Sequence, residues 1–197
     1  EYVEKENVGK ANGKYLLFLE EGIEKAKSGW LKKMVEDGAQ NEIGVVGAKV
    51  MEKTGKQLHA GMILGGKGMI HYVAEKSDIN DVGYMGRYVC TQEYSAVSGM
   101  CMLVERQCFE AVGGFDNELT GELRYTDLCL KIREAGYKVM YEPEAMIYIK
   151  KSIHQNLSEK QYFSKRWHNI LKHGDMYYNK NLEIEDVLYV LKKEPRN

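Results

Sequence analysis

The stretch Asp127-Leu-Cys-Leu-Lys-Ile-Arg-Glu-Ala-Gly-Tyr137 decides the fold, because it predicts a helix that leads directly into strands. Apolar residues recur in it at helical spacing, and Gly136 is typical of the residue that ends a helix. Two short apolar segments follow at 137–141 and 145–149, on either side of Pro143, and indicate strands. A helix followed at once by strands is typical of a layered α/β protein.

The same alternation of strands and helices extends through the rest of the chain. Residues 55–97 are rich in glycine, which indicates hairpins and loops. Further buried strands are expected at 15–19, 43–50 and 96–104. Helices are expected at 28–38, 106–112, 127–135, 158–174 and 184–191. Ser28 is expected to cap the first of these helices, and Ser158 with Gln161 forms a capping box at the start of the helix at 158–174. The pattern predicts an α/β fold with a mixed sheet flanked by helices.

Composition excludes several classes of function. The 197 residues include 28 basic and 29 acidic side chains, so the net charge of -1 gives no general attraction to nucleic acid. No apolar run approaches the ~20 residues of a membrane-spanning helix. The 4 cysteines form no C-x-x-C pair, which excludes a zinc knuckle, and without a signal peptide they are expected to be free thiols. The 14 tyrosines suit either a polar ring-shaped ligand or a hydrated surface.

The segment from Gly61 to Lys67 matches the phosphate-binding pattern G-x-x-x-x-G-K. The following residue is Gly68, whereas a P-loop needs Ser or Thr there to hold magnesium. Residues 69–73 read as a strand, but a P-loop leads into a helix. A glycine-rich hairpin is therefore the better interpretation.

Several segments, taken in order, point to a known family. They are Ala11-Asn-Gly-Lys-Tyr-Leu-Leu-Phe-Leu19, Gly44-Val-Val-Gly-Ala-Lys49, His59-Ala-Gly61, Gly83-Tyr-Met-Gly-Arg87, residues 94–104, Val112-Gly-Gly-Phe-Asp116, residues 127–137 and Asp175-Met-Tyr-Tyr-Asn-Lys-Asn-Leu182. The chain resembles family 2 glycosyltransferases of the GT-A fold, and within them the bacterial rhamnosyltransferase-like members. The resemblance implies transfer of a sugar from a nucleotide-sugar donor to a glycan acceptor.

The resemblance also defines the expected domain organisation. The glycosyltransferase-like domain covers residues 1–184, and residues 185–197 form a C-terminal helix or tail. The family's first β-α-β unit, which carries much of the nucleotide site, is expected to precede residue 10 and is missing from this chain. The chain is therefore expected to be the C-terminal part of a GT-A fold.

The family's metal position is altered in this sequence. The family ends the strand at 15–19 with carboxylates in a D-x-D-like pattern, which hold a divalent metal on the donor diphosphate. Here Glu20-Glu21-Gly22 stands instead, with Gly22 at the usual Asp position. Glu20 or Glu21 remains a candidate ligand for Mn²⁺ or Mg²⁺, and a solvated acidic turn is the alternative.

The position of the family's general base is altered as well. The resemblance places that carboxylate at Tyr125, and a phenol with a pKa of about 10 is a poor base at neutral pH. Asp127 is kept and stays a candidate catalytic residue, although capping of the following helix is an alternative role.

The remaining candidate residues surround the implied donor site. Lys150 and Lys151 stand where the family places His, and they are expected either to neutralise a diphosphate without metal or to be solvated. Ser98 and Gly99 are expected beside the donor sugar, because a missing side chain lets a ligand approach the backbone. His59 is a candidate for the acceptor cleft.

Two hypotheses follow from the altered positions. The first is an active transferase in which unusual residues carry the chemistry. The second, which the three altered positions favour, is a domain that is inactive as an isolated chain and binds a glycan or partner, or acts as a scaffold in a larger polysaccharide transferase with another transferase domain. Either protein is expected in the cytoplasm or at the inner face of the cell membrane.

Overall fold

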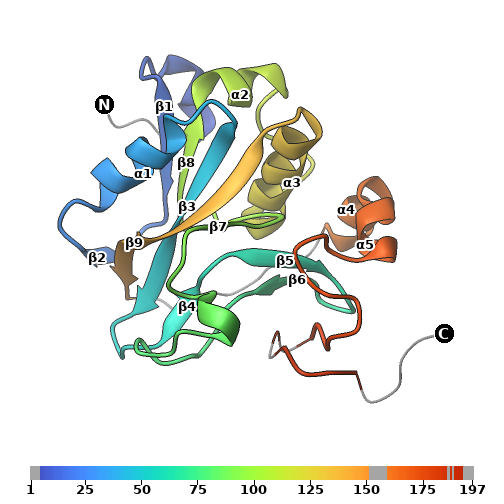
Figure 1. Cartoon of the computed structure of the whole chain (residues 1–197). Coiled ribbons are helices and arrows are strands. Elements are labelled where there is room, and N and C mark those ends of the chain that lie inside the picture. Colours follow the sequence, from blue (N-terminus) through green and yellow to red (C-terminus); the bar gives the residue numbers. More distant parts are fainter. Residues whose placement is uncertain (1–4, 151–158, 186, 188, 193–197) are drawn as a thin grey trace.

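A mixed β-sheet runs through the middle of the molecule in the computed structural model, which describes residues 5–150, 159–185, 187 and 189–192 (Figure 1). In these residues five strands follow the order β1, β8, β3, β9, β2, while β4 pairs with β3 and β7 pairs with β9. Strands β3 and β9 run parallel, and the other pairs are antiparallel. The bounds are β1 Tyr15–Leu19, β2 Ile23–Ala26, β3 Ile43–Glu52, β4 Gln57–His59, β7 Gln92–Glu93, β8 Cys101–Glu105 and β9 Lys138–Ile149.

Helices cover this sheet, and a separate hairpin extends from it. Helices α1 and α3 both pack on β3 and β9, and α5 packs on the hairpin strand β5. The bounds are α1 Trp30–Gly38, α2 Arg106–Ala111, α3 Gly121–Glu134, α4 Lys160–Arg166, α5 His168–His173, β5 Met62–Gly65 and β6 Met69–Tyr72, with 3-10 turns at Lys5–Lys10 and Tyr84–Gly86. The expected α/β class with a mixed sheet flanked by helices is confirmed.

The strand pattern follows from burial. Strand β3 is buried over nine of its ten residues, as the continuous apolar run at 43–50 predicts for the centre of a sheet. Residues 138–149 form one strand rather than two, because the register against β3 shifts between Ala48 and Lys49 and accommodates Pro143 in the irregularity. The segment rejected as a P-loop contributes to the β5–β6 hairpin, which confirms that interpretation.

The predicted helix ends differ most from the structure. Gly29, without a side-chain cap bond, precedes α1, so the expected cap by Ser28 is wrong. The expected helix at 158–174 is two short helices that break at Trp167, while Ser158 lies outside the described residues. The described part of 184–191 is not helical, because the chain turns back and the Glu183 N–H donates to the Val190 carbonyl over 2.8 Å.

The strand expected at 96–104 and the helix expected at 127–135 also begin elsewhere. Strand β8 begins only at Cys101, because residues 97–100 form a loop that turns toward α3. Helix α3 begins at Gly121, six residues before the predicted start at Asp127. Leu119 and Leu123 are fully buried, and their packing in the core holds the part of α3 that precedes Asp127. Among the described residues, no helix is both long enough and apolar enough to span a membrane.

Candidate functional site

Three segments that are distant in sequence meet at one end of the main sheet. They are the turn 20–22 after β1, the loop 97–100 before β8, and the first turn of α3. The Glu20 N–H donates to the Met100 carbonyl over 2.9 Å, and the Lys150 N–H donates to the Gly22 carbonyl over 3.1 Å. The fold therefore brings the predicted metal, diphosphate and sugar positions into one neighbourhood.

Glu122 is the central carboxylate of this neighbourhood, and the sequence analysis missed it. Its Oε2 accepts a hydrogen bond from the Ser98 hydroxyl over 3.0 Å, and its Oε1 accepts one from the Gly99 N–H over 3.1 Å. Burial raises the pKa of the Glu122 carboxyl, and the nearby charge of Glu20 raises that pKa further. An acidic residue in the first turn of a helix is a recognisable pattern, but Glu122 fits it only once α3 is known to begin at Gly121.

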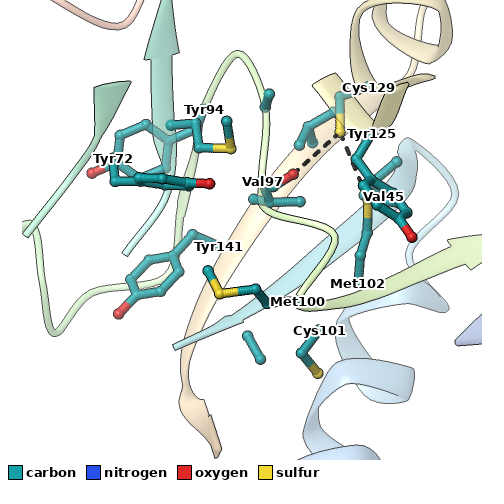
Figure 2. Close-up of a cluster of buried hydrophobic side chains, with 14 of the residues drawn as sticks. Val45, Tyr72, Tyr94, Val97, Met100, Cys101, Met102, Tyr125, Cys129 and Tyr141 are labelled. Atoms are coloured by element: carbon teal, nitrogen blue, oxygen red, sulfur yellow. Dashed lines mark hydrogen bonds between the residues drawn. The ribbon is translucent and has the colours of Figure 1, made fainter. Parts of the chain in front are cut away.

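Tyr125 fills space next to the same loop instead of facing solvent. Its side chain is 6% exposed, and a Cβ atom on Gly99 would lie 2.2 Å from its ring. The Tyr125 ring also makes edge contacts with Phe18 at 6.0 Å and Phe115 at 5.4 Å between centroids. Figure 2 shows Tyr125 on one side of Val97, with the rings of the β6 and β9 region on the other side. Gly99 lacks a side chain here because the tyrosine ring occupies that volume.

Asp127 is fully buried in the middle of α3 and holds α3 to the chain around α4. Its Oδ1 accepts a hydrogen bond from the Trp167 Nε1 over 2.9 Å and pairs with the Arg166 Nε at 3.0 Å. Lys131 lies 3.5 Å from its Oδ2. The alternative that Asp127 caps its helix is wrong, because Thr120 is the residue that precedes α3.

His59 lies behind the loop 97–100 and is fully buried. Its Nδ1–H donates to the Ala48 carbonyl over 3.1 Å, and its Nε2 accepts from the Ser98 N–H over 3.0 Å. Burial lowers the pKa of His59 to about 4, so the ring is neutral at physiological pH. His59 therefore holds Ser98 in place from within the protein, and an acceptor-site role for it stays a prediction.

The predicted metal position is the turn that carries the carboxylates of Glu20 and Glu21. Glu21 is exposed, Glu20 is partly buried, and Gly22 lies in a left-handed turn with φ of 89°. Within the ranges that the structure describes, no group of three or more His, Cys, Asp or Glu side chains converges on a point. Cation sites in proteins gather several oxygen ligands around one ion, and this turn offers no such set. Lys150 is exposed beside the turn, and Lys151 lies outside the described residues.

Comparison with known sequences gives two relatives. No family model matches the chain. It is 33% identical over 203 residues to "Uncharacterized protein y4gI" of Sinorhizobium fredii (strain NBRC 101917 / NGR234), a match that covers 93% of this chain. It is 24% identical over 196 residues to "O-antigen biosynthesis protein RfbC" of Myxococcus xanthus, which covers 95% of this chain. The chain spans only 22% and 15% of the lengths of these two relatives.

Comparison with solved structures defines the fold. The chain superposes on the crystal structure of GalNAc-T7 with UDP, GalNAc and Mn²⁺ at a TM-score of 0.52 and 13% sequence identity. The superposition covers 72% of this chain and 28% of that protein. The fold is therefore GT-A-like, and the chain shares its architecture with glycosyltransferases.

Proposed function

We propose that this chain is a family 2 glycosyltransferase-like domain of polysaccharide biosynthesis that does not transfer sugar as an isolated chain. The GT-A-like fold and the relative named for O-antigen biosynthesis support the connection to nucleotide sugars and glycans. In this proposal the domain binds a glycan or a partner, or supports another transferase domain, at a cytoplasmic site or at the inner face of the cell membrane.

The proposal rests on the burial of the two candidate catalytic residues, Tyr125 and Asp127. A general base must lie within hydrogen-bond reach of the acceptor hydroxyl and must have a suitable pKa. Tyr125 is packed against Gly99 and two phenylalanines, and Asp127 is fully buried against Trp167 and Arg166. Neither side chain presents a carboxylate to an acceptor at the donor site.

Titration calorimetry with UDP and GDP, with and without MnCl₂, tests the proposal. A transferase that holds its donor through a metal binds the diphosphate more tightly when Mn²⁺ is present. We expect no manganese-dependent heat from this chain, with a metal-dependent glycosyltransferase as the positive control. Manganese-dependent binding of either nucleotide would contradict the proposal.

One observation favours a second candidate, an active transferase in which Glu122 is the base. Glu122 lies one helical turn before Tyr125, and burial raises the pKa of its carboxyl toward the range useful for proton transfer. Hydrolysis or transfer of a nucleotide sugar by the chain, lost in Glu122→Gln and kept in Glu118→Gln, would establish this alternative.

A further inference from the structure

We propose that the groove beside the C-terminal end of α3 binds a neutral oligosaccharide, at a site separate from the donor neighbourhood. Two hollows form the groove, with volumes of about 560 Å³ and about 340 Å³. The larger lies between the region around β7 and the chain after α5, whose course is visible in Figure 1. Its lining residues are Arg87, Gln92, Glu93, Met176, Tyr177, Tyr178 and Asn179, and those of the smaller are Gln40, Asn41, Glu42, Ile43, Glu93, Lys138 and Met140.

Glu93 lines both hollows, so they lie next to each other. Its Oε2 accepts a hydrogen bond from the Tyr177 hydroxyl over 2.9 Å, and its Oε1 lies 3.4 Å from the Lys138 ammonium. Lys138 also pairs with Glu42 at 2.7 Å. These contacts fix the polar groups along the groove before any ligand arrives, which lowers the entropic cost of binding.

The chemistry of the lining matches sugar rings better than anionic ligands. Within the lining, the cations Arg87 and Lys138 are balanced by the carboxylates of Glu42 and Glu93. A diphosphate or nucleic acid favours an excess of cations, which this lining does not provide. Amides and carboxylates exchange hydrogen bonds with hydroxyl groups, which donate and accept.

The groove also has apolar surface suited to the less polar faces of a sugar ring. Tyr177 and the methionine Met176, which is 74% exposed, lie in the larger hollow, and Met140 lies in the smaller. Tyrosine combines an apolar ring with a hydrogen-bonding hydroxyl, which suits a ligand of alternating character. The two hollows share the side chain of Glu93, and the proposal places successive sugar units of one chain on either side of it.

The groove is distinct from the neighbourhood of Glu122. The Arg133 guanidinium lies 5.0 Å from the centroid of the Tyr177 ring, so the groove adjoins the C-terminal end of α3. Glu122 lies in the first turn of the same helix, and the rise of an α-helix separates Glu122 from Arg133 by roughly 16 Å. The identity of the ligand as a glycan rests in part on the proposed function, whereas the groove and its charge balance do not.

Methyl NMR of the chain labelled with [¹³C-methyl]methionine tests the inference directly. The probes are neutral hexasaccharides of glucose, mannose, galactose and rhamnose, and a heparin hexasaccharide serves as the anionic comparison. We expect at least one neutral probe to shift the methyl signals of Met176 and Met140 while Met51, which is fully buried, stays unchanged. Absence of any shift, or shifts with heparin alone, would overturn the inference.

A matched pair of variants assigns the binding to the groove. Glu93→Gln keeps the shape of the side chain and removes its charge, so we expect the affinity for the active probe to fall about ten-fold. Glu110→Gln, in α2 and outside the lining of both hollows, is expected to leave the affinity unchanged. Unchanged affinity in Glu93→Gln would overturn the inference. If Glu93→Gln does not fold, Met176→Ala gives a second test, and we expect this variant to bind the active probe at least threefold more weakly. Nucleotide calorimetry remains a separate result, so failure of glycan binding and failure of the proposed function are distinguishable.

Discussion

The two ends of α3 use polar side chains in opposite ways. In the N-terminal half, Glu122 bonds to the loop 97–100 and Asp127 bonds to Trp167 and Arg166. At the C-terminal end, Arg133 lies over Tyr177 at the wall of an open groove. Polar groups at the first end bond to neighbouring segments inside the protein, whereas Arg133 packs on Tyr177, a residue that lines an open groove.

The difference shows that the two halves of α3 serve different purposes in the same GT-A-like fold. A buried carboxylate needs a partner inside the protein, because an unpaired buried charge is costly. Tryptophan and arginine supply that partner for Asp127, and an aromatic ring occupies the space at Gly99. We call the N-terminal half of α3 with the loop 97–100 the closed end, and the C-terminal end beside Tyr177 the open end. Substitutions at the closed end are expected to cost stability, whereas those at the open end are expected to leave stability nearly unchanged.

The largest expected effect follows from removal of the buried carboxylate at the closed end. Asp127→Ala leaves Trp167 and Arg166 without their shared acceptor, so we expect the free energy of unfolding to fall by about 3 kcal/mol. Urea denaturation measures this change. Glu110→Ala, which removes an exposed partner of Arg106, is expected to change stability by less than about 0.5 kcal/mol. Equal effects of the two substitutions would remove the structural role assigned to Asp127.

His59 gives the closed end a defined pH dependence. The folded pKa of about 4 lies below the unfolded value of about 6.5, so the unfolded chain binds a proton that the folded chain excludes between these values. Stability from this residue is complete above pH 6.5 and is lost as the pH falls, by about 3 kcal/mol at pH 4. Denaturation of the parent and of His59→Gln at several pH values isolates this contribution. If the free energy of unfolding of both proteins changes with pH in the same way, His59 is not held in its neutral form in the folded protein.

The packing of Tyr125 against Gly99 predicts a coupled pair of substitutions. Gly99→Ala places a methyl group within 2.2 Å of the ring, and we expect a loss of about 2 kcal/mol. In the background of Tyr125→Ala the same substitution should cost much less, because the ring that it meets is absent. Additive losses in this double-mutant cycle would argue that the ring does not occupy the volume beside Gly99.

The smallest effect on stability is expected at the open end. Met176 is 74% exposed, so Met176→Ala should change the free energy of unfolding by less than about 0.5 kcal/mol. Thermal denaturation of Met176→Ala and of Asp127→Ala under the same conditions compares the stability changes at the two ends of α3. A loss above about 2 kcal/mol for Met176→Ala would mean that the groove wall is part of the core.

The sequence by itself determined the fold class and the elements whose signals are local. The apolar runs specified β1 and β3, and the helix at 106–112 was found nearly complete in α2. Gly68 in place of Ser or Thr, followed by a strand pattern, excluded the P-loop. Such features depend on periodicity and turn chemistry within a few residues, which a single sequence displays directly.

Only the tertiary structure decided the state of the candidate site. The start of α3 at Gly121 depends on burial of Leu119 and Leu123, and this start is what makes Glu122 part of the site. Trp167 donates a hydrogen bond to Asp127, and the ring of Tyr125 lies against Gly99. In both pairs the two residues lie far apart in sequence. Side-chain pairing across such distances is set by packing of the whole core, which no local pattern encodes.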